Sequence, residues 1–273
     1  MNAPRFGSDR VALVAVWRKR RIFALHAVAN LTLLGLVWLW LSIPESRAWH
    51  LLLSALLAAA IALGALWLHG ATLHLFRRVH QDERSGVTDS FRATLRVLPA
   101  LLVWGAVGGM AFALIGRIED LVPILSEWTS SALTFLLRRP VSPERAEMML
   151  AIPVVVLRWV AAPLVLLLLG SAVSEEGFDA LRGRGLDRVI GRVGRIGLWW
   201  RCAILVSVGL GLPSVLVRWV PEFEGMRAQG ASMTVRFLAA YSLAIAAWLV
   251  LASIIGLGGR AAESPPVIAP PVR

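Results

Sequence analysis

One arginine of this chain lies where a positive charge is costly. Arg158 falls inside an apolar run from Met148 to Ser171, and a cation within a membrane-spanning helix often contacts a substrate or an anion. Its neighbour Trp159 offers a second interpretation, because the same dipeptide recurs as Arg218-Trp219 at the end of another apolar run. Trp favours the membrane interface, and Arg extends its charged end toward water. Arg158 is therefore the candidate ligand-binding residue, with an interfacial anchor as the alternative.

Several Arg and Trp residues fit the anchor role. They stand at the ends of apolar runs, where an aromatic ring can sit at the headgroup level and a guanidinium can reach water. The predicted interface anchors are Trp159, Arg218, Trp219, Trp199, Trp200 and Arg201.

Two histidines could hold a haem. His26 and His69 lie toward the same ends of the first two apolar runs, and a bis-His haem needs one such side chain from each of two helices. The competing interpretation is that these histidines only form hydrogen bonds, because membrane histidines often face polar bundle interiors without a metal. Outside this hypothesis we predict no cofactor and no metal site.

No catalytic motif is present in the sequence. Glu175-Glu176 followed by Arg182 resembles the paired-glutamate motif of the intramembrane CAAX-type proteases, but every His precedes the glutamates, whereas that family needs His on later helices. The common metalloprotease, nucleophile-elbow and phosphate-loop motifs do not occur. The prediction therefore favours a protein that is not an enzyme.

Six apolar runs must position these residues. A helix of about 20 apolar residues crosses a bilayer, and each run is near or above that length. The runs are Ile22–Ile43, Ala48–Phe76, Val97–Gly116, Met148–Ser171, Leu198–Val220 and Phe237–Gly258. The chain is 58% hydrophobic and 16% charged, against about 25% charged in soluble domains. The predicted fold is an all-α polytopic integral membrane bundle with six transmembrane helices over residues 22–258.

The first apolar run does not have the features of a cleaved signal peptide. The run is too long for the apolar core of a cleaved signal peptide, and no small-residue cleavage site follows it, so we expect a retained helix. The single cysteine, Cys202, cannot form an intramolecular disulfide.

Basic residues are distributed unequally about the spans. Of the 28 Lys and Arg residues, 18 lie on the side of the two termini and eight on the other, with Arg158 and Arg201 inside runs. Basic residues are retained on the cytoplasmic side. We therefore predict a multi-pass protein of the bacterial inner membrane with both termini cytoplasmic.

The net charge of +11 has two interpretations. A basic protein can bind nucleic acid, but these clusters flank membrane spans and contain no aromatic stacking pattern. The predicted partners are membrane lipids, with anionic headgroups at the cytoplasmic face, and a protein partner or second copy, with no nucleic acid.

Three segments that precede spans share a short pattern. Asp9, Asp89 and Asp187 are each followed by apolar residues two and six positions later, which gives one apolar helix face behind a good N-cap. The pattern predicts an amphipathic helix plus a transmembrane hairpin, used three times, with the first amphipathic segment in residues 1–21. This arrangement resembles uncharacterised bacterial six-span membrane protein families, including the membrane domain that accompanies some glycerophosphodiester phosphodiesterases. The resemblance covers most of the chain in outline and implies no catalytic residue.

Two segments outside the spans have distinct patterns. Apolar residues at helical spacing predict an outer interfacial helix at about 119–138, with a re-entrant half-helix as the alternative. Residues 259–273 are rich in Pro and are predicted to be a disordered cytoplasmic tail.

The functional prediction is a non-catalytic scaffold or accessory subunit that interacts with lipid or with a partner. Missing catalytic motifs and basic amphipathic segments motivate it. The alternatives are a transporter-like protein with a central cavity near Arg158, and a haem-binding membrane protein through His26 and His69.

Overall fold

The computed structural model shows an all-helical chain with no strand in the part that it describes, which is residues 6–44, 46–81, 86–182, 184–221 and 223–263. Six helices in these ranges are long and apolar enough to cross a membrane. The predicted six-helix membrane fold is therefore confirmed. The α-helices are α1 (Phe6–Arg18), α2 (Arg21–Leu41), α3 (Ala48–His80), α4 (Val87–Leu137), α5 (Pro143–Val156), α6 (Ala162–Glu176), α7 (Arg184–Val193), α8 (Ile196–Val206), α9 (Leu212–Arg218) and α10 (Met226–Glu263).

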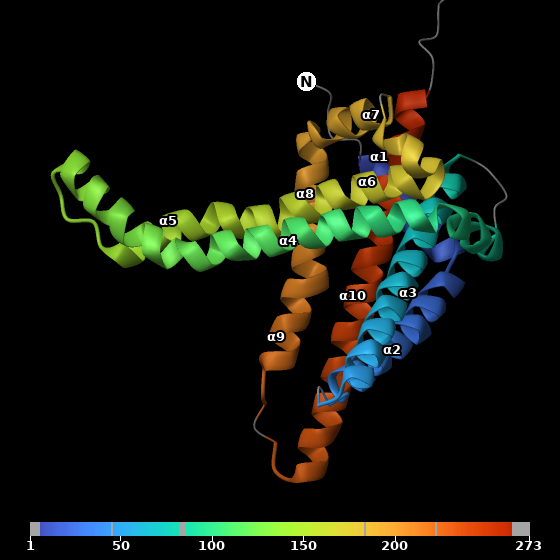
Figure 1. Cartoon of the computed structure of the whole chain (residues 1–273), viewed down its shortest axis with the longest axis horizontal. Helices are drawn as coiled ribbons and strands as arrows, with labels where there is room; N and C mark the ends of the chain where they lie inside the picture. The colour runs from blue at the N-terminus through green and yellow to red at the C-terminus, as the bar shows by residue number, and fades with distance from the viewer. Residues whose placement is uncertain (1–5, 45, 82–85, 183, 222, 264–273) are drawn as a thin grey trace, which may run out of the picture.

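The helices form three hairpins that meet at one end. The first is α2 with α3, the second is α4 with α5–α6, and the third is α8–α9 with α10. We call the end where α1, α7 and the last turns of α3, α6 and α10 gather the α1 end, and the opposite end the far end. From the α1 end, the α4–α6 hairpin runs in a direction different from α3 and α10, so the arms diverge toward the far end (Figure 1).

Helix α4 is one uninterrupted helix of 51 residues. The chain therefore does not form a separate helix at about 119–138, as the sequence predicted, because those residues continue the third span. At about 1.5 Å per residue α4 is roughly 76 Å long, more than twice the hydrocarbon thickness of a bilayer. In the sequence, the charged residues near position 119 suggested that a connection between spans begins there. In the structure, α5 packs along this part of α4 and supports the helix.

Two spans contain a π-helical turn just before a proline. The segment η1 (Leu157–Ala161) joins α5 to α6, and η3 (Ser207–Gly211) joins α8 to α9. A proline lacks an N–H group and its ring clashes with the carbonyl four residues earlier. For Pro163 and Pro213 that carbonyl lies inside η1 and η3, so the wider turn accommodates each proline and the helix continues.

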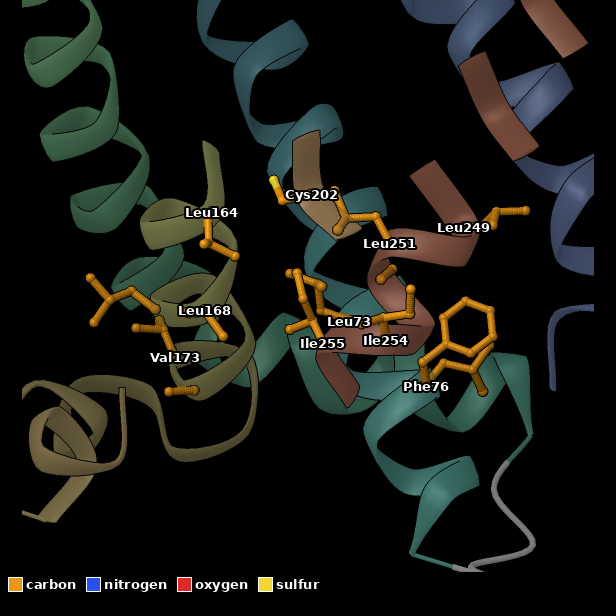
Figure 2. Close-up of a cluster of buried hydrophobic side chains, with 14 of the residues drawn as sticks. Leu73, Phe76, Leu164, Leu168, Val173, Cys202, Leu249, Leu251, Ile254 and Ile255 are labelled. Atoms are coloured by element: carbon orange, nitrogen blue, oxygen red, sulfur yellow. The ribbon is translucent and has the colours of Figure 1, made fainter. Parts of the chain in front are cut away.

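The buried core lies at the α1 end. Side chains from α3, α6 and α10 interlock there, including Leu73, Phe76, Leu168 and Ile255 (Figure 2). A Cβ at Gly256 would lie 2.8 Å from the Phe76 carbonyl carbon, so α10 approaches α3 through a glycine. Large apolar side chains toward the far end are exposed, as expected where lipid is the solvent.

The structure describes the predicted N-terminal segment and the first part of the predicted C-terminal tail as helices. The N-terminal segment forms α1, with Ala12 and Ala15 buried. Helix α10 continues to Glu263, five residues into the predicted tail. The proline-rich residues 264–273 lie outside the described residues.

Candidate functional site

Arg158 forms an ion pair with a glutamate of the neighbouring helix. Its guanidinium donates to a carboxylate oxygen of Glu119 on α4, and both side chains are partly exposed, at 34% and 47%. The guanidinium also lies 5.6 Å from the ring centre of Trp159, within the range of a cation–π contact. Sequence reasoning missed Glu119 as a partner because it assigned this residue to an outer segment separate from the third span.

The position of this pair along the α4–α6 hairpin favours the anchor interpretation. At the α1 end, a Cβ on Gly177 would touch Val97, at 3.4 Å. From Val97 to Glu119 the helix rises about 33 Å, and from Gly177 back to Arg158 it rises about 28 Å. Both lengths match a hydrocarbon layer of about 30 Å. The ligand-binding role of Arg158 stays a prediction.

The remaining predicted anchors contact protein as well as the surface. Arg201 on α8 pairs with Asp9 on α1, with Nε and Oδ1 at 2.9 Å, and Trp199 donates its indole N–H to the Val193 carbonyl at 2.7 Å. Trp200 is 67% exposed. At the far end Arg218 closes α9, and Trp219 is 59% exposed.

A buried charged network joins the hairpins at the α1 end. Arg77 of α3 is 5% exposed and forms ion pairs with Glu175 and Glu176 at the end of α6. Arg188 of α7 lies 2.8 Å from Glu176. Both glutamates lie beyond the predicted span Met148–Ser171, in the last turn of α6. One feature of the sequence could have indicated this pairing: an acidic pair follows one apolar run, and Arg77 follows another.

Arg192 of α7 completes the connection to α10. It is 8% exposed and donates to the Ile255 carbonyl. Burial, and then the charges of Arg77 and Arg195, lower the pKa of Arg192 to about 10. The α1 end is therefore a region of positive potential held together by ion pairs and carbonyl contacts.

The structure brings His26 and His69 together. Their ring centroids are 5.6 Å apart at an interplanar angle of 41°, and His26 Nε2 lies 2.7 Å from Thr72 Oγ1. The ring of Trp248 on α10 packs edge-on against His69 at 4.8 Å. The haem role of this pair stays a prediction.

An apolar groove lies where the diverging arms separate. It has a volume of about 410 Å³ and is lined by residues of α4, η1, α6, α8, η3 and α10. Among them, Leu167 and Leu205 each lie nine residues from the α1 end of α6 and α8, or about 14 Å along the helix axis. That is about half the hydrocarbon thickness, which puts the groove floor at the middle depth of these two spans.

A second groove adjoins the first. Its volume is about 370 Å³, and it runs between the two π-helical segments, with Trp159, Val206 and Leu210 lining both grooves. Both grooves lie between the α4–α6 hairpin and the third hairpin, and we call the two grooves together the channel.

Comparison with known proteins does not place this chain in a family. No family model, curated protein or solved structure matches it. The predicted resemblance to six-span bacterial families stays a prediction.

Proposed function

We infer that this chain is a lipid-binding protein of the bacterial inner membrane, without catalytic activity, which holds a lipid chain in the channel between its second and third hairpins. The observation that carries this proposal is the groove of about 410 Å³ at the middle depth of the spans. A groove of this size falls within the range of ligand-binding pockets.

The chemistry of the groove wall fits a hydrocarbon chain. Phe112, Pro163 and Leu166 line it from one side, and Leu205 and Leu251 from the other. Water in this groove would lack hydrogen-bond partners, whereas an acyl or isoprenoid chain has no hydrogen bonds to lose when it enters.

The charge distribution gives the proposed orientation. The α1 end carries the excess of Arg residues, and we place it in the cytoplasm with both termini, by the positive-inside rule. Exposed Arg10 and Arg18 on α1 would then lie against the cytoplasmic leaflet, where each basic residue gains about 1 kcal/mol from anionic lipid.

The contacts of Arg158 give little support to a transport function. Its side chain pairs with Glu119 on α4, and it is not among the residues that line either groove, although its neighbour Trp159 is. A scaffold that binds a protein partner is distinguished from lipid binding by the experiment below.

Photo-crosslinking in native membranes tests the proposal. A phospholipid with a photoreactive group near the middle of one acyl chain should label α6, α8 and α10 at the groove. Ala244→Phe fills the groove and should reduce this labelling at least fivefold. Ala59→Phe, on an exposed face of α3, is the matched control and should leave it unchanged. Equal labelling in both variants, or a co-purifying protein that occupies the groove in place of lipid, would contradict lipid binding.

A further inference from the structure

His26 has one ring nitrogen fixed as a donor and the other left over. The Thr72 hydroxyl donates its only proton to the Leu68 carbonyl at 2.8 Å. Its oxygen must therefore accept from His26 Nε2–H at 2.7 Å. His26 is fully buried, and a protonated Nδ1 there would be an unpaired buried cation, which is costly. His26 Nδ1 therefore carries a lone pair, and no hydrogen-bond partner satisfies it.

His69 presents a second unsatisfied nitrogen beside the first. Its Nδ1 is also buried and without a hydrogen-bond partner, and its ring lies 5.6 Å from that of His26. A buried polar atom without a partner needs an explanation, such as a bound water or ion. With metal–nitrogen bonds of about 2.0 Å, two imidazole rings that share one ion have centroids on the order of 6 Å apart.

We propose that His26 and His69 form a two-imidazole site between α2 and α3 for a monovalent copper ion. The Thr72 contact is the kind of outer contact that metal-binding histidines have, since it fixes the tautomer and the direction of the ligand lone pair. Imidazole nitrogen is a suitable ligand for copper. The site is separate from the lipid groove and does not depend on the proposed lipid binding.

The small number of protein ligands at this site favours Cu(I) over other metal ions. Among the described residues no group of three or more His, Cys, Asp or Glu side chains is placed to hold a metal. Zn²⁺ in structural sites takes four ligands, and a divalent charge without a carboxylate would be poorly compensated in a membrane span. Cu(I) carries one charge and accepts two ligands, so it fits both restrictions.

The surroundings shield the site without placing it at the bilayer centre. Trp248 packs edge-on against His69 and is also one of the residues that line the groove. His26 is only five residues after Arg21, the first residue of α2, or about 8 Å from that helix end. A charge at this depth costs less than one at the centre, because water and headgroups are near.

Competition for copper tests the site in the full-length protein in lipid nanodiscs. Under anaerobic conditions with ascorbate, the protein should remove one equivalent of Cu(I) from a chromophoric Cu(I) chelator. His26→Ala and His69→Phe should abolish this competition, and the phenylalanine keeps a ring against Trp248. Thr72→Val should weaken the affinity by 10- to 100-fold, as other outer contacts of metal-bound histidines do.

Matched variants separate this site from other copper ligands. His50→Ala removes another buried histidine, at the far end of α3, and Cys202→Ala removes the single thiol; both should bind as the unaltered protein does. No competition by the unaltered protein would overturn the proposal and leave a bound water as the partner of His26. Retained competition in a folded His69→Phe variant, or preferential binding of Zn²⁺, would also overturn it.

Discussion

The buried ion pairs of Arg77 make the strongest prediction about stability. Arg77→Gln leaves Glu175 and Glu176 without their main cation at the end of α6. Removing one partner of a buried pair costs about 3–5 kcal/mol. Here Glu175 is 25% exposed, and Arg188 still neutralises Glu176. Solvent screening and the remaining Arg reduce the expected loss to about 2 kcal/mol.

Unfolding in mixed micelles by added denaturing detergent, followed by circular dichroism, measures this loss. A double-mutant cycle with Glu175→Gln should give a coupling energy of about 1–2 kcal/mol between the two side chains. Arg182→Gln is the control, because its contact with Asp179 is long and both side chains are more than 80% exposed. If Arg77→Gln and Arg182→Gln lose the same small amount, the network does not join the hairpins and the reasoning is refuted.

Two further predictions concern single contacts, and a third concerns the proposed orientation. Gly256→Leu forces a side chain against the α3 backbone and should lower the free energy of unfolding by about 1–3 kcal/mol. Gly109→Leu is the control and should not lower it, because open space surrounds Gly109. Equal losses in the two variants would contradict the close approach of α10 to α3. Tyr241→Phe removes a 2.6 Å hydrogen bond to an α2 carbonyl and should cost about 1 kcal/mol in the same unfolding assay, so an unchanged midpoint would show that this bond contributes nothing. In a Cys202→Ala background, Glu224→Cys at the far end should react with a membrane-impermeant maleimide in intact spheroplasts, and labelling only after lysis would reverse the proposed orientation.

The spans could be predicted because their signal is local. Runs such as Phe237–Gly258 are apolar over enough consecutive residues to show a crossing without knowledge of any neighbour. The prediction that adjacent spans pair as hairpins came instead from the recurring pattern at Asp9, Asp89 and Asp187. The threefold repeat stays a prediction, since α1 and α7 are separate short helices whereas the corresponding segment after Asp89 is continuous with α4.

The contacts within the candidate sites could not be predicted, because they depend on register between distant residues. Arg158 and Glu119 are 39 positions apart, and they meet only because α4 continues through the segment that looked like a connection. The pairing of Arg77 with Glu175 likewise depends on how far α3 and α6 extend past their apolar runs. His26 and His69 could be paired from the sequence because they lie toward the same ends of two adjacent spans. The Thr72 contact that fixes the tautomer of His26 could not, because it depends on how α2 and α3 pack.

The length of α4 makes this protein responsive to the thickness of its membrane. A helix of 51 residues exceeds the span of any bilayer, so it adapts to the surrounding lipid by changing its tilt, whereas α2, with 21 residues, has little length to spare. We expect a thicker bilayer to hold the α4–α6 hairpin more upright and a thinner one to let it tilt further. The width of the channel between the arms would then vary with the acyl-chain length of the host membrane.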